Sequence, residues 1–123
     1  MISSRKIEDL SIKMKPLCVS WCSQMTDASI DYIITCTGRT QLEQEILYAQ
    51  GRTTPGRIVT WTLHSKHLTG DAFDFVIMFS GKPDWNMSQK DMWSKAVEIG
   101  KSLGLSQVIN SKGKILEFAH LQI

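Results

Sequence analysis

The sequence has no apolar run that could cross a membrane, since a spanning helix needs about 20 consecutive apolar residues. A basic pair, Arg5-Lys6, lies near the N-terminus, but the apolar stretch of a signal peptide does not follow it. We therefore expect a protein that does not insert into membranes and that is made and kept in the cytoplasm. A substrate on the far side of the membrane would require a separate release step.

Cysteine is also scarce, and the three residues are Cys18, Cys22 and Cys36. An odd number without a signal peptide favours reduced thiols. Cys18 and Cys22 are four residues apart, so on a helix they would share a face and could supply two metal ligands. A thiolate metal site normally has more Cys or His at close spacing, so we favour small buried apolar residues.

The net charge and the absence of repetitive sequence argue against further classes of protein. The net charge is only +2, and no basic run indicates a nucleic-acid-binding groove. Internal repeats, linkers and low-complexity tracts are absent. A chain of 123 residues can bury a core without metal or disulfide staples, so we predict one domain over residues 1–123.

Hydrophobic periodicity and turn signals predict an α+β fold with a small, mostly antiparallel sheet flanked by helices. We expect a first helix through Ile7, Leu10 and Met14, which Pro16 ends, and a second helix that begins at Pro16. A capping box, Thr40 to Glu43, predicts a third helix with Leu42, Ile46 and Ala49 facing inward. The remaining predicted elements are strands at 30–36, 58–63, 72–79, 108–109 and 115–123, a helix at 89–103 and a turn at 110–113.

The stretch from Ser65 to Phe75 contains a candidate metal site. It places His67 and Asp74 seven residues apart, with Gly70 between them to let the loop turn sharply. Asp74 lies within an apolar strand, where an unpaired carboxylate is costly to bury. A metal ion would neutralise it, but an open sheet edge or an arginine would serve equally well, so both interpretations stay open.

A second cluster, Glu117-Phe118-Ala119-His120, lies near the C-terminus. Two histidines and one carboxylate are a common set for a catalytic Zn²⁺, and the chain has three histidines, of which His64 is the spare. On a regular strand Glu117 and His120 would point to opposite faces. For both to face one metal, we expect a turn at Phe118-Ala119, with His120 opening a short final strand.

These residues resemble a known family. Ser-x-His-x-x-Gly-x-Ala-x-Asp, from Ser65 to Asp74, is similar to the zinc-binding signature of the VanY-type peptidoglycan peptidases, which include D-alanyl-D-alanine carboxypeptidases and the L-alanyl-D-glutamate endopeptidases used as phage endolysins. The similarity extends to Glu117-x-x-His120 and to an upstream block that resembles the endolysin branch. That block consists of Thr37-Gly38-Arg39-Thr40, Glu43-Gln44, 47–53, Pro55-Gly56 and Val59-Thr60.

The resemblance implies a fold, a site and a setting. The fold would be a hedgehog-like or DD-peptidase-like domain. One Zn²⁺ would be held by His67, Asp74 and His120, with Glu117 as the catalytic acid/base. Arg39 would assist catalysis and bind substrate, and Ser65, the motif serine beside the site, would also bind substrate. The substrate would be the peptide stem of peptidoglycan, cut by a monomer that a separate holin-type pore releases from the bacterial host cytoplasm to reach the periplasmic cell wall during lysis.

One departure affects substrate preference. Endolysins of this branch often have a Gly-Gly-x-Trp-like segment before an Asp. This chain instead has Asn-Ser-Lys-Gly-Lys-Ile-Leu at residues 110–116, without the Trp, and its acidic residue is Glu117. Two alternatives therefore stay open: a D-Ala-D-Ala carboxypeptidase, and a non-catalytic, zinc-stabilised module that binds the cell wall.

Overall fold

The computed structural model describes residues 4–60, 62–109 and 115–123, and for residues 109 and 115–118 it describes the backbone alone. Within these residues, five strands form an antiparallel sheet of order β1-β2-β5-β4, with β3 paired to β2. This confirms the predicted α+β class. The elements in chain order are η1 (Ile7–Asp9), α1 (Met14–Asp27), β1 (Asp31–Cys36), α2 (Gln41–Ala49), η2 (Lys66–Leu68), β2 (Ala72–Phe79), β3 (Lys82–Pro83), α3 (Lys90–Ser102), β4 (Ser106–Ile109) and β5 (Ile115–Gln122).

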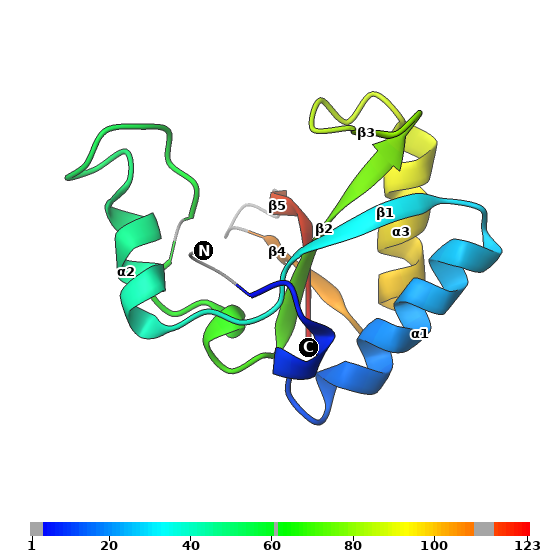
Figure 1. Cartoon of the computed structure of the whole chain (residues 1–123), viewed down its shortest axis with the longest axis horizontal. Helices are drawn as coiled ribbons and strands as arrows, with labels where there is room; N and C mark the ends of the chain where they lie inside the picture. Colours follow the sequence, from blue (N-terminus) through cyan, green and yellow to red (C-terminus); the bar gives the residue numbers. More distant parts are fainter. Residues whose placement is uncertain (1–3, 61, 110–114) are drawn as a thin grey trace.

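Strand β2 lies at the centre of the fold, as its near-continuous apolar sequence predicts. Helices α1 and α3 lie together on one side of the sheet (Figure 1). Phe73 and Phe75 face them, since both rings contact Trp21 of α1 and Phe75 also contacts Trp93 of α3. Successive side chains of a strand alternate between faces, so Asp74 projects from the opposite face.

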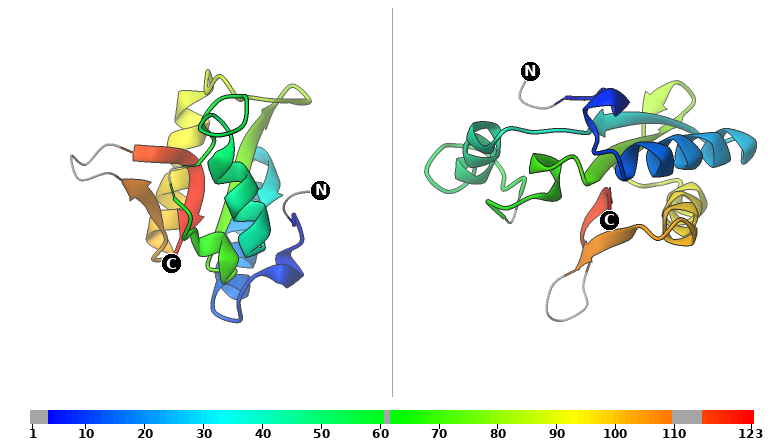
Figure 2. Two further views of the ribbon diagram at one scale, coloured as in Figure 1. Left: turned by 90° about the vertical axis from the view of Figure 1, so that its left-hand side faces the viewer. Right: turned by 90° about the horizontal axis from the view of Figure 1, so that it is seen from below.

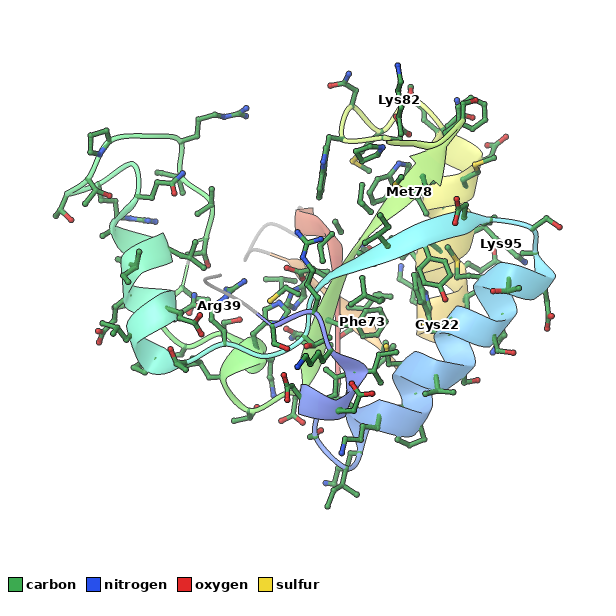
Figure 3. The ribbon with its side chains drawn as sticks, in the orientation of Figure 1. Cys22, Arg39, Phe73, Met78, Lys82 and Lys95 are labelled. Atoms are coloured by element: carbon green, nitrogen blue, oxygen red, sulfur yellow. The ribbon has the colours of Figure 1, made fainter. Side chains whose placement is uncertain are left out.

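The core between α1, α3 and β2 is built on a helical stripe of α1. Met14, Cys18, Trp21 and Met25 are all fully buried, and the Trp21 indole N–H donates to the Ala96 carbonyl at 2.9 Å. A fully buried side chain of this size contributes on the order of 2–3 kcal/mol through transfer from water. Figure 3 shows Phe73 between β2 and this helical layer. The layer gives β2 a rigid support from which Asp74 projects.

The predicted helix break at Pro16 is wrong. Helix α1 begins at Met14 and includes Pro16 in its first turn, and only Ile7–Asp9 forms a separate short 3-10 helix. The first backbone N–H groups of a helix have no partner within the helix, so a proline there removes no hydrogen bond. Ser11 instead accepts from the Met14 N–H, through both its carbonyl and its hydroxyl.

Helix α2 and the loop after it lie across β2 from α1 and α3 (Figures 1 and 2). The predicted capping box is present, with Thr40 and Glu43 bonded reciprocally. The predicted inward face is wrong: Leu42 is 66% exposed and Ile46 is 49% exposed, while the buried residue is Gln44. The predicted strand at 58–63 is also wrong in the residues described, which are irregular there. Its threonines bond to Gln44 rather than to a neighbouring strand.

The C-terminal part follows the prediction closely. Helix α3 spans Lys90–Ser102 and is followed by Gly104 at φ +87°, and strands β4 and β5 complete the sheet. The predicted turn at 110–113 lies outside the described residues. No helix in the part of the chain that the structure describes is both long and apolar enough to cross a membrane.

Candidate functional site

Asp74 lies where three strands meet at one level of the sheet. The register pairs Asp74 of β2 with Cys36 of β1 on one side and with His120 of β5 on the other. Directly paired residues project from the same face with Cβ atoms about 4.5–5.5 Å apart. A thiol, a carboxylate and an imidazole therefore stand in a row on the face opposite the helical core.

An irregularity in β1 gives Cys36 its place in this row. Ile34 pairs with Phe75, but Cys36, two residues later, pairs with the next residue of β2, Asp74. Such a bulge leaves one residue, Thr35, outside the ladder and re-aims those that follow it. The chain then runs past the site, and the Arg39 N–H donates to the His67 carbonyl at 3.1 Å.

His67 reaches the same face from the loop before β2. The Ser65 hydroxyl accepts from the His67 N–H at 3.2 Å and so caps the short helix η2. Gly70 has φ +74°, and a Cβ there would lie 2.7 Å from the Ser11 backbone nitrogen, so only glycine fits this turn. The sharp turn that the sequence predicts at Gly70 is confirmed. It folds His67 back over the start of β2, where its side chain is 2% exposed.

The two histidines converge on one carboxylate oxygen. Asp74 Oδ1 lies 3.0 Å from His67 Nε2 and 2.8 Å from His120 Nδ1. The imidazole rings are edge to face, with centroids 5.0 Å apart. The structure thus brings together His67, Asp74 and His120, the three residues that the sequence analysis selected. Because Asp74 is held by two imidazoles, it is neither unpaired at an open edge nor dependent on an arginine.

Each imidazole also has a partner on its far side. His67 Nδ1 lies 3.2 Å from the Thr37 carbonyl oxygen, and His120 Nε2 lies 3.0 Å from Gln122 Oε1. An N–H that bonds an outer oxygen fixes the tautomer and leaves a lone pair on the other ring nitrogen. With a cation bound beside Asp74, both rings can therefore present a lone pair to the ion, as metal-binding histidines do.

The charges of His67 and Asp74 depend on each other, because the two side chains are hydrogen-bonded. Burial alone would lower the pKa of His67, but hydrogen bonds with Asp74 and Cys36 outweigh it and raise that pKa from 6.5 to about 10. Burial alone would raise the pKa of Asp74, but hydrogen bonds from His120 and His67 hold it well below its ordinary range. Without a bound cation, His67 and Asp74 therefore form an imidazolium–carboxylate pair.

We expect the metal-free protein to be less stable at about pH 9.5 than at about pH 6. The pKa of His67 is about 10 when folded and 6.5 in the reference state, so the folded chain keeps a proton that the unfolded chain loses in this window. The free energy of unfolding then falls as pH rises, by at most a few kcal/mol at about 1.4 kcal/mol per pKa unit.

Urea unfolding of chelator-treated protein at the two pH values measures this fall. Asp74→Asn is the matched control, because it keeps the shape of the side chain and removes the charge that raises the His67 pKa. The variant should lose most of the pH dependence, and an equal fall in both proteins would contradict the ion pair.

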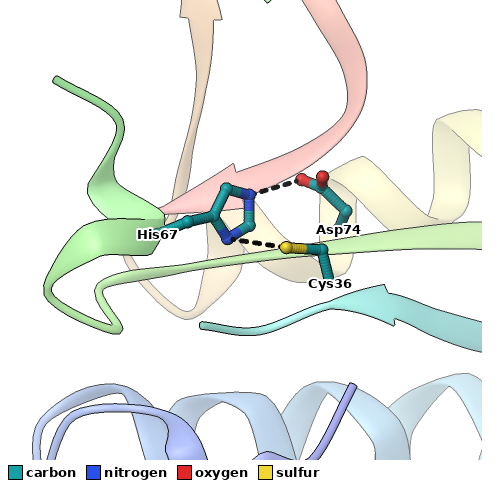
Figure 4. Close-up of side chains that lie close together, drawn as sticks. All are labelled: Cys36, His67 and Asp74. Atoms are coloured by element: carbon teal, nitrogen blue, oxygen red, sulfur yellow. Dashed lines mark hydrogen bonds and ion pairs between the residues drawn. The ribbon is translucent and has the colours of Figure 1, made fainter. Parts of the chain in front are cut away.

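Among the side chains that the structure describes, two sets around Asp74 offer donors for a metal ion. One is Cys36, His67 and Asp74, whose ligand atoms all lie within 4.8 Å of one another. Figure 4 shows the difficulty with this set: Cys36 Sγ approaches Nδ1 of His67, at 3.5 Å, while Asp74 approaches Nε2. The two nitrogens of one imidazole point in different directions, so a single ion cannot bind both.

The other set is His67, Asp74 and His120, in which one nitrogen of each imidazole lies against the same carboxylate oxygen. Adjacent ligands around tetrahedral zinc lie about 3.3 Å apart, given bonds of about 2.0–2.1 Å. The donor distances of 2.8 and 3.0 Å would therefore have to open by a few tenths of an ångström. Two imidazoles and a carboxylate match the donor chemistry that zinc prefers, so the residue types of this set favour the ion.

A cavity of about 270 Å³ opens over this cluster. Asp74 lies in it with a side chain 26% exposed, and Arg39 and Ser65 line its wall. Figure 3 shows Arg39 between α2 and β2. The two residues predicted to bind substrate, Arg39 and Ser65, thus line the same cavity as the carboxylate. The full set of lining residues is Arg39, Leu47, Val59, Thr60, Ser65, His67, Asp74, Ala119 and His120.

The geometry predicted around Glu117 is partly corrected. Strand β5 runs without a break from Ile115 to Gln122, so no turn separates Glu117 from His120. Its pairing with β4 is irregular instead: a step of two positions in β4, from Ser106 to Val108, corresponds to a step of five positions in β5, from Gln122 to Glu117. Figure 2 shows β5 curving along its length. The predicted turn at Phe118-Ala119 is therefore wrong, because one strand includes both Glu117 and His120, and the Glu117 side chain lies outside the described residues.

Two other residues complete the comparison with the sequence. His64 is exposed, and its backbone N–H bonds the Thr62 hydroxyl. No role was predicted for Gln44, which is fully buried and bonded to Arg39. A glutamine four residues after the Thr40 cap, on the inward side of a short helix, was the available signal.

Known proteins resemble this chain in sequence and in fold. No family model matches the sequence. The chain is 36% identical over 103 residues to the peptidoglycan L-alanyl-D-glutamate endopeptidase CwlK of Bacillus subtilis (strain 168), a match that covers 76% of this chain and 61% of CwlK. The chain thus spans about three-fifths of that relative.

The fold matches the crystal structure of the Serratia marcescens L-Ala D-Glu endopeptidase ChiX with a TM-score of 0.68. This match covers 99% of the chain and 86% of ChiX. At 18% sequence identity, it shows that the two proteins share a fold.

Proposed function

We propose that this protein is a zinc peptidase that hydrolyses the L-alanyl-D-glutamate bond in the peptide stem of peptidoglycan. The observation that carries the proposal is the convergence of His67 and His120 on one oxygen of Asp74, in a cavity that Arg39 also lines. The similarity to CwlK supports the choice of substrate and bond. The carboxylate of Glu117, which can act as an acid/base, favours catalysis over wall binding alone.

The ligands of the ion are proposed to be His67, Asp74 and His120. When bound, Zn²⁺ supplies a Lewis acid that activates water and polarises a carbonyl. The Thr37 carbonyl and the Gln122 amide oxygen hold the outer nitrogens of the two imidazoles, which fixes the direction of their lone pairs. Ser65 helps to hold His67 in place, because its side-chain hydroxyl accepts from the backbone N–H of His67 and so caps η2.

Glu117 and Arg39 are the proposed catalytic residues. Glu117 would accept a proton from the attacking water and deliver a proton to the leaving amine. Arg39 would donate hydrogen bonds to the carbonyl oxygen of the scissile bond as negative charge develops there. A guanidinium in the cavity wall also suits a substrate that carries carboxylates.

The biological setting is part of the proposal. The upstream block from Thr37 to Thr60 resembles the endolysin branch, which favours a phage enzyme that lyses its host. Such an enzyme would be made in the host cytoplasm and would act on the cell wall after a separate holin-type pore releases it. It would act as a monomer on a thin peptidoglycan layer.

Digestion of purified peptidoglycan tests the function. We expect fragment masses that correspond to cleavage between L-alanine and D-glutamate, loss of all fragments with chelator, and recovery with added Zn²⁺. Release of terminal D-alanine instead would make the protein a carboxypeptidase. Binding to the sacculus without any fragment would make it a wall-binding module, and either result would overturn the proposal.

A further inference from the structure

Gln44 is a polar side chain buried at a position of α2 where an apolar side chain would be expected. It is fully buried on α2, while Leu42 and Ile46 on the same helix are exposed. An amide of this kind is stable away from water only when its hydrogen bonds are made. Gln44 makes them with three partners on two different segments, which are Arg39, Thr60 and Thr62.

The bonds fix which way the amide faces. Gln44 Oε1 accepts from Arg39 Nη1 at 2.7 Å, and Gln44 Nε2 donates to the Thr62 carbonyl at 2.6 Å and to the Thr60 hydroxyl at 3.3 Å. A guanidinium can only donate, and a carbonyl can only accept. The reversed amide would oppose donor to donor and acceptor to acceptor, so this orientation is determined by the neighbours.

Arg39 is thereby held at both ends. Its backbone N–H bonds the carbonyl of His67, which fixes the residue to the loop of a proposed metal ligand. Its guanidinium donates to Gln44 and, through Nη2, to Cys36 Sγ at 3.3 Å. The same amide that orients the guanidinium also ties down Thr60, another lining residue of the cavity.

We infer that Gln44 is a positioning residue that aims the Arg39 guanidinium into the cavity beside Asp74 and His120. This inference rests on the proposed function, in which Arg39 meets the developing charge of the substrate. A displacement of about 1 Å in a catalytic group lowers the rate about 100-fold. Gln44 itself lies behind Arg39, away from the reacting atoms.

Two substitutions separate this role from a structural one. Gln44→Met keeps the length and the helix propensity of the side chain but loses the acceptor for Arg39. Gln44→Glu keeps an acceptor for Arg39 but loses the donors to Thr60 and Thr62. If Gln44 only stabilised the fold, Gln44→Glu would lose more activity than Gln44→Met, because it buries a carboxylate against the Thr62 carbonyl.

The test is steady-state digestion of peptidoglycan by the zinc-loaded full chain, at a temperature where circular dichroism shows every variant folded. We expect kcat to fall about 10- to 100-fold in Gln44→Met, with little change in KM, and to recover at least partly in Gln44→Glu. Gln41→Met is the matched control, since Gln41 is an exposed glutamine of the same helix, and it should leave kcat unchanged. Wild-type kcat in Gln44→Met, or a lower kcat in Gln44→Glu than in Gln44→Met, would overturn the inference.

A second readout separates this inference from the proposed function. The Arg39 side-chain N–H signals in ¹⁵N NMR should exchange slowly with water in the wild type and in Gln44→Glu, and rapidly in Gln44→Met. If the wild type releases no fragment, the proposed function fails, and the NMR signals alone decide the role of Gln44. Unchanged exchange in Gln44→Met would show that Gln44 does not orient Arg39.

Discussion

His67→Ala is expected to lose bound zinc and peptidoglycan hydrolysis together, with activity at least about 10³-fold below the wild type. His67 supplies one of two imidazole nitrogens that meet at Asp74, and its side chain is almost fully buried against that carboxylate. The alanine would leave one histidine and one carboxylate, and a two-ligand site holds zinc poorly. It would also leave the buried carboxylate without one of its two partners.

Zinc content by mass spectrometry and fragment release measure the two losses on the same sample. His64→Ala is the matched control, because His64 is exposed and lies three residues earlier on the same loop. It should retain both zinc and activity. Stoichiometric zinc in purified His67→Ala would contradict the ligand assignment.

Cys36→Ala on the same assay distinguishes the two donor sets. Cys36 Sγ approaches His67 from the nitrogen that faces away from Asp74. If His67, Asp74 and His120 hold the ion, the cysteine variant keeps its zinc. Loss of zinc in Cys36→Ala with retention in His120→Ala would move the site to the Cys36 side of the imidazole.

The part of the site that the sequence predicts well is the part encoded by short spacing. His67, Gly70 and Asp74 lie within eight residues, and a glycine with positive φ is enough to fold the histidine back onto the strand. The apolar run around Asp74 likewise predicts the bounds of β2. What these patterns could not supply is the register between distant strands, which places Cys36 and His120 on either side of Asp74.

The errors lie where tertiary contacts override local periodicity. Leu42 and Ile46 recur at helical spacing, yet α2 turns Gln44 inward because Arg39 and the segment at 60–62 provide partners for its amide. The β-branched residues of 58–63 likewise favour a strand. In the structure the Thr60 hydroxyl and the Thr62 carbonyl bond this amide instead. Both departures lie beside the cavity, since Val59 and Thr60 line it and Gln44 bonds the lining residue Arg39, as expected where a binding site rather than the core shapes the chain.

Glu117→Gln is expected to keep the fold and the bound zinc but to lose catalysis, with kcat about 10²- to 10⁴-fold lower. The amide has nearly the size of the carboxylate but cannot accept a proton from water and then deliver it to the leaving amine. Glu117 is not among the three proposed ligands, so the metal should remain. In the sheet, the register between β4 and β5 shifts within the stretch from Glu117 to Gln122, which includes His120.

Kinetics on peptidoglycan, zinc content and thermal unfolding of Glu117→Gln separate catalysis from binding and folding. Glu98→Gln is the matched control: its carboxylate is 72% exposed on α3, where it contacts only Lys95 among the ion pairs of the described residues. That variant should behave as the wild type in all three measurements. Glu117→Gln should match it in zinc content and unfolding temperature and differ in kcat alone. Full activity in Glu117→Gln would remove this residue from the mechanism, and loss of zinc would make it a ligand rather than the acid/base.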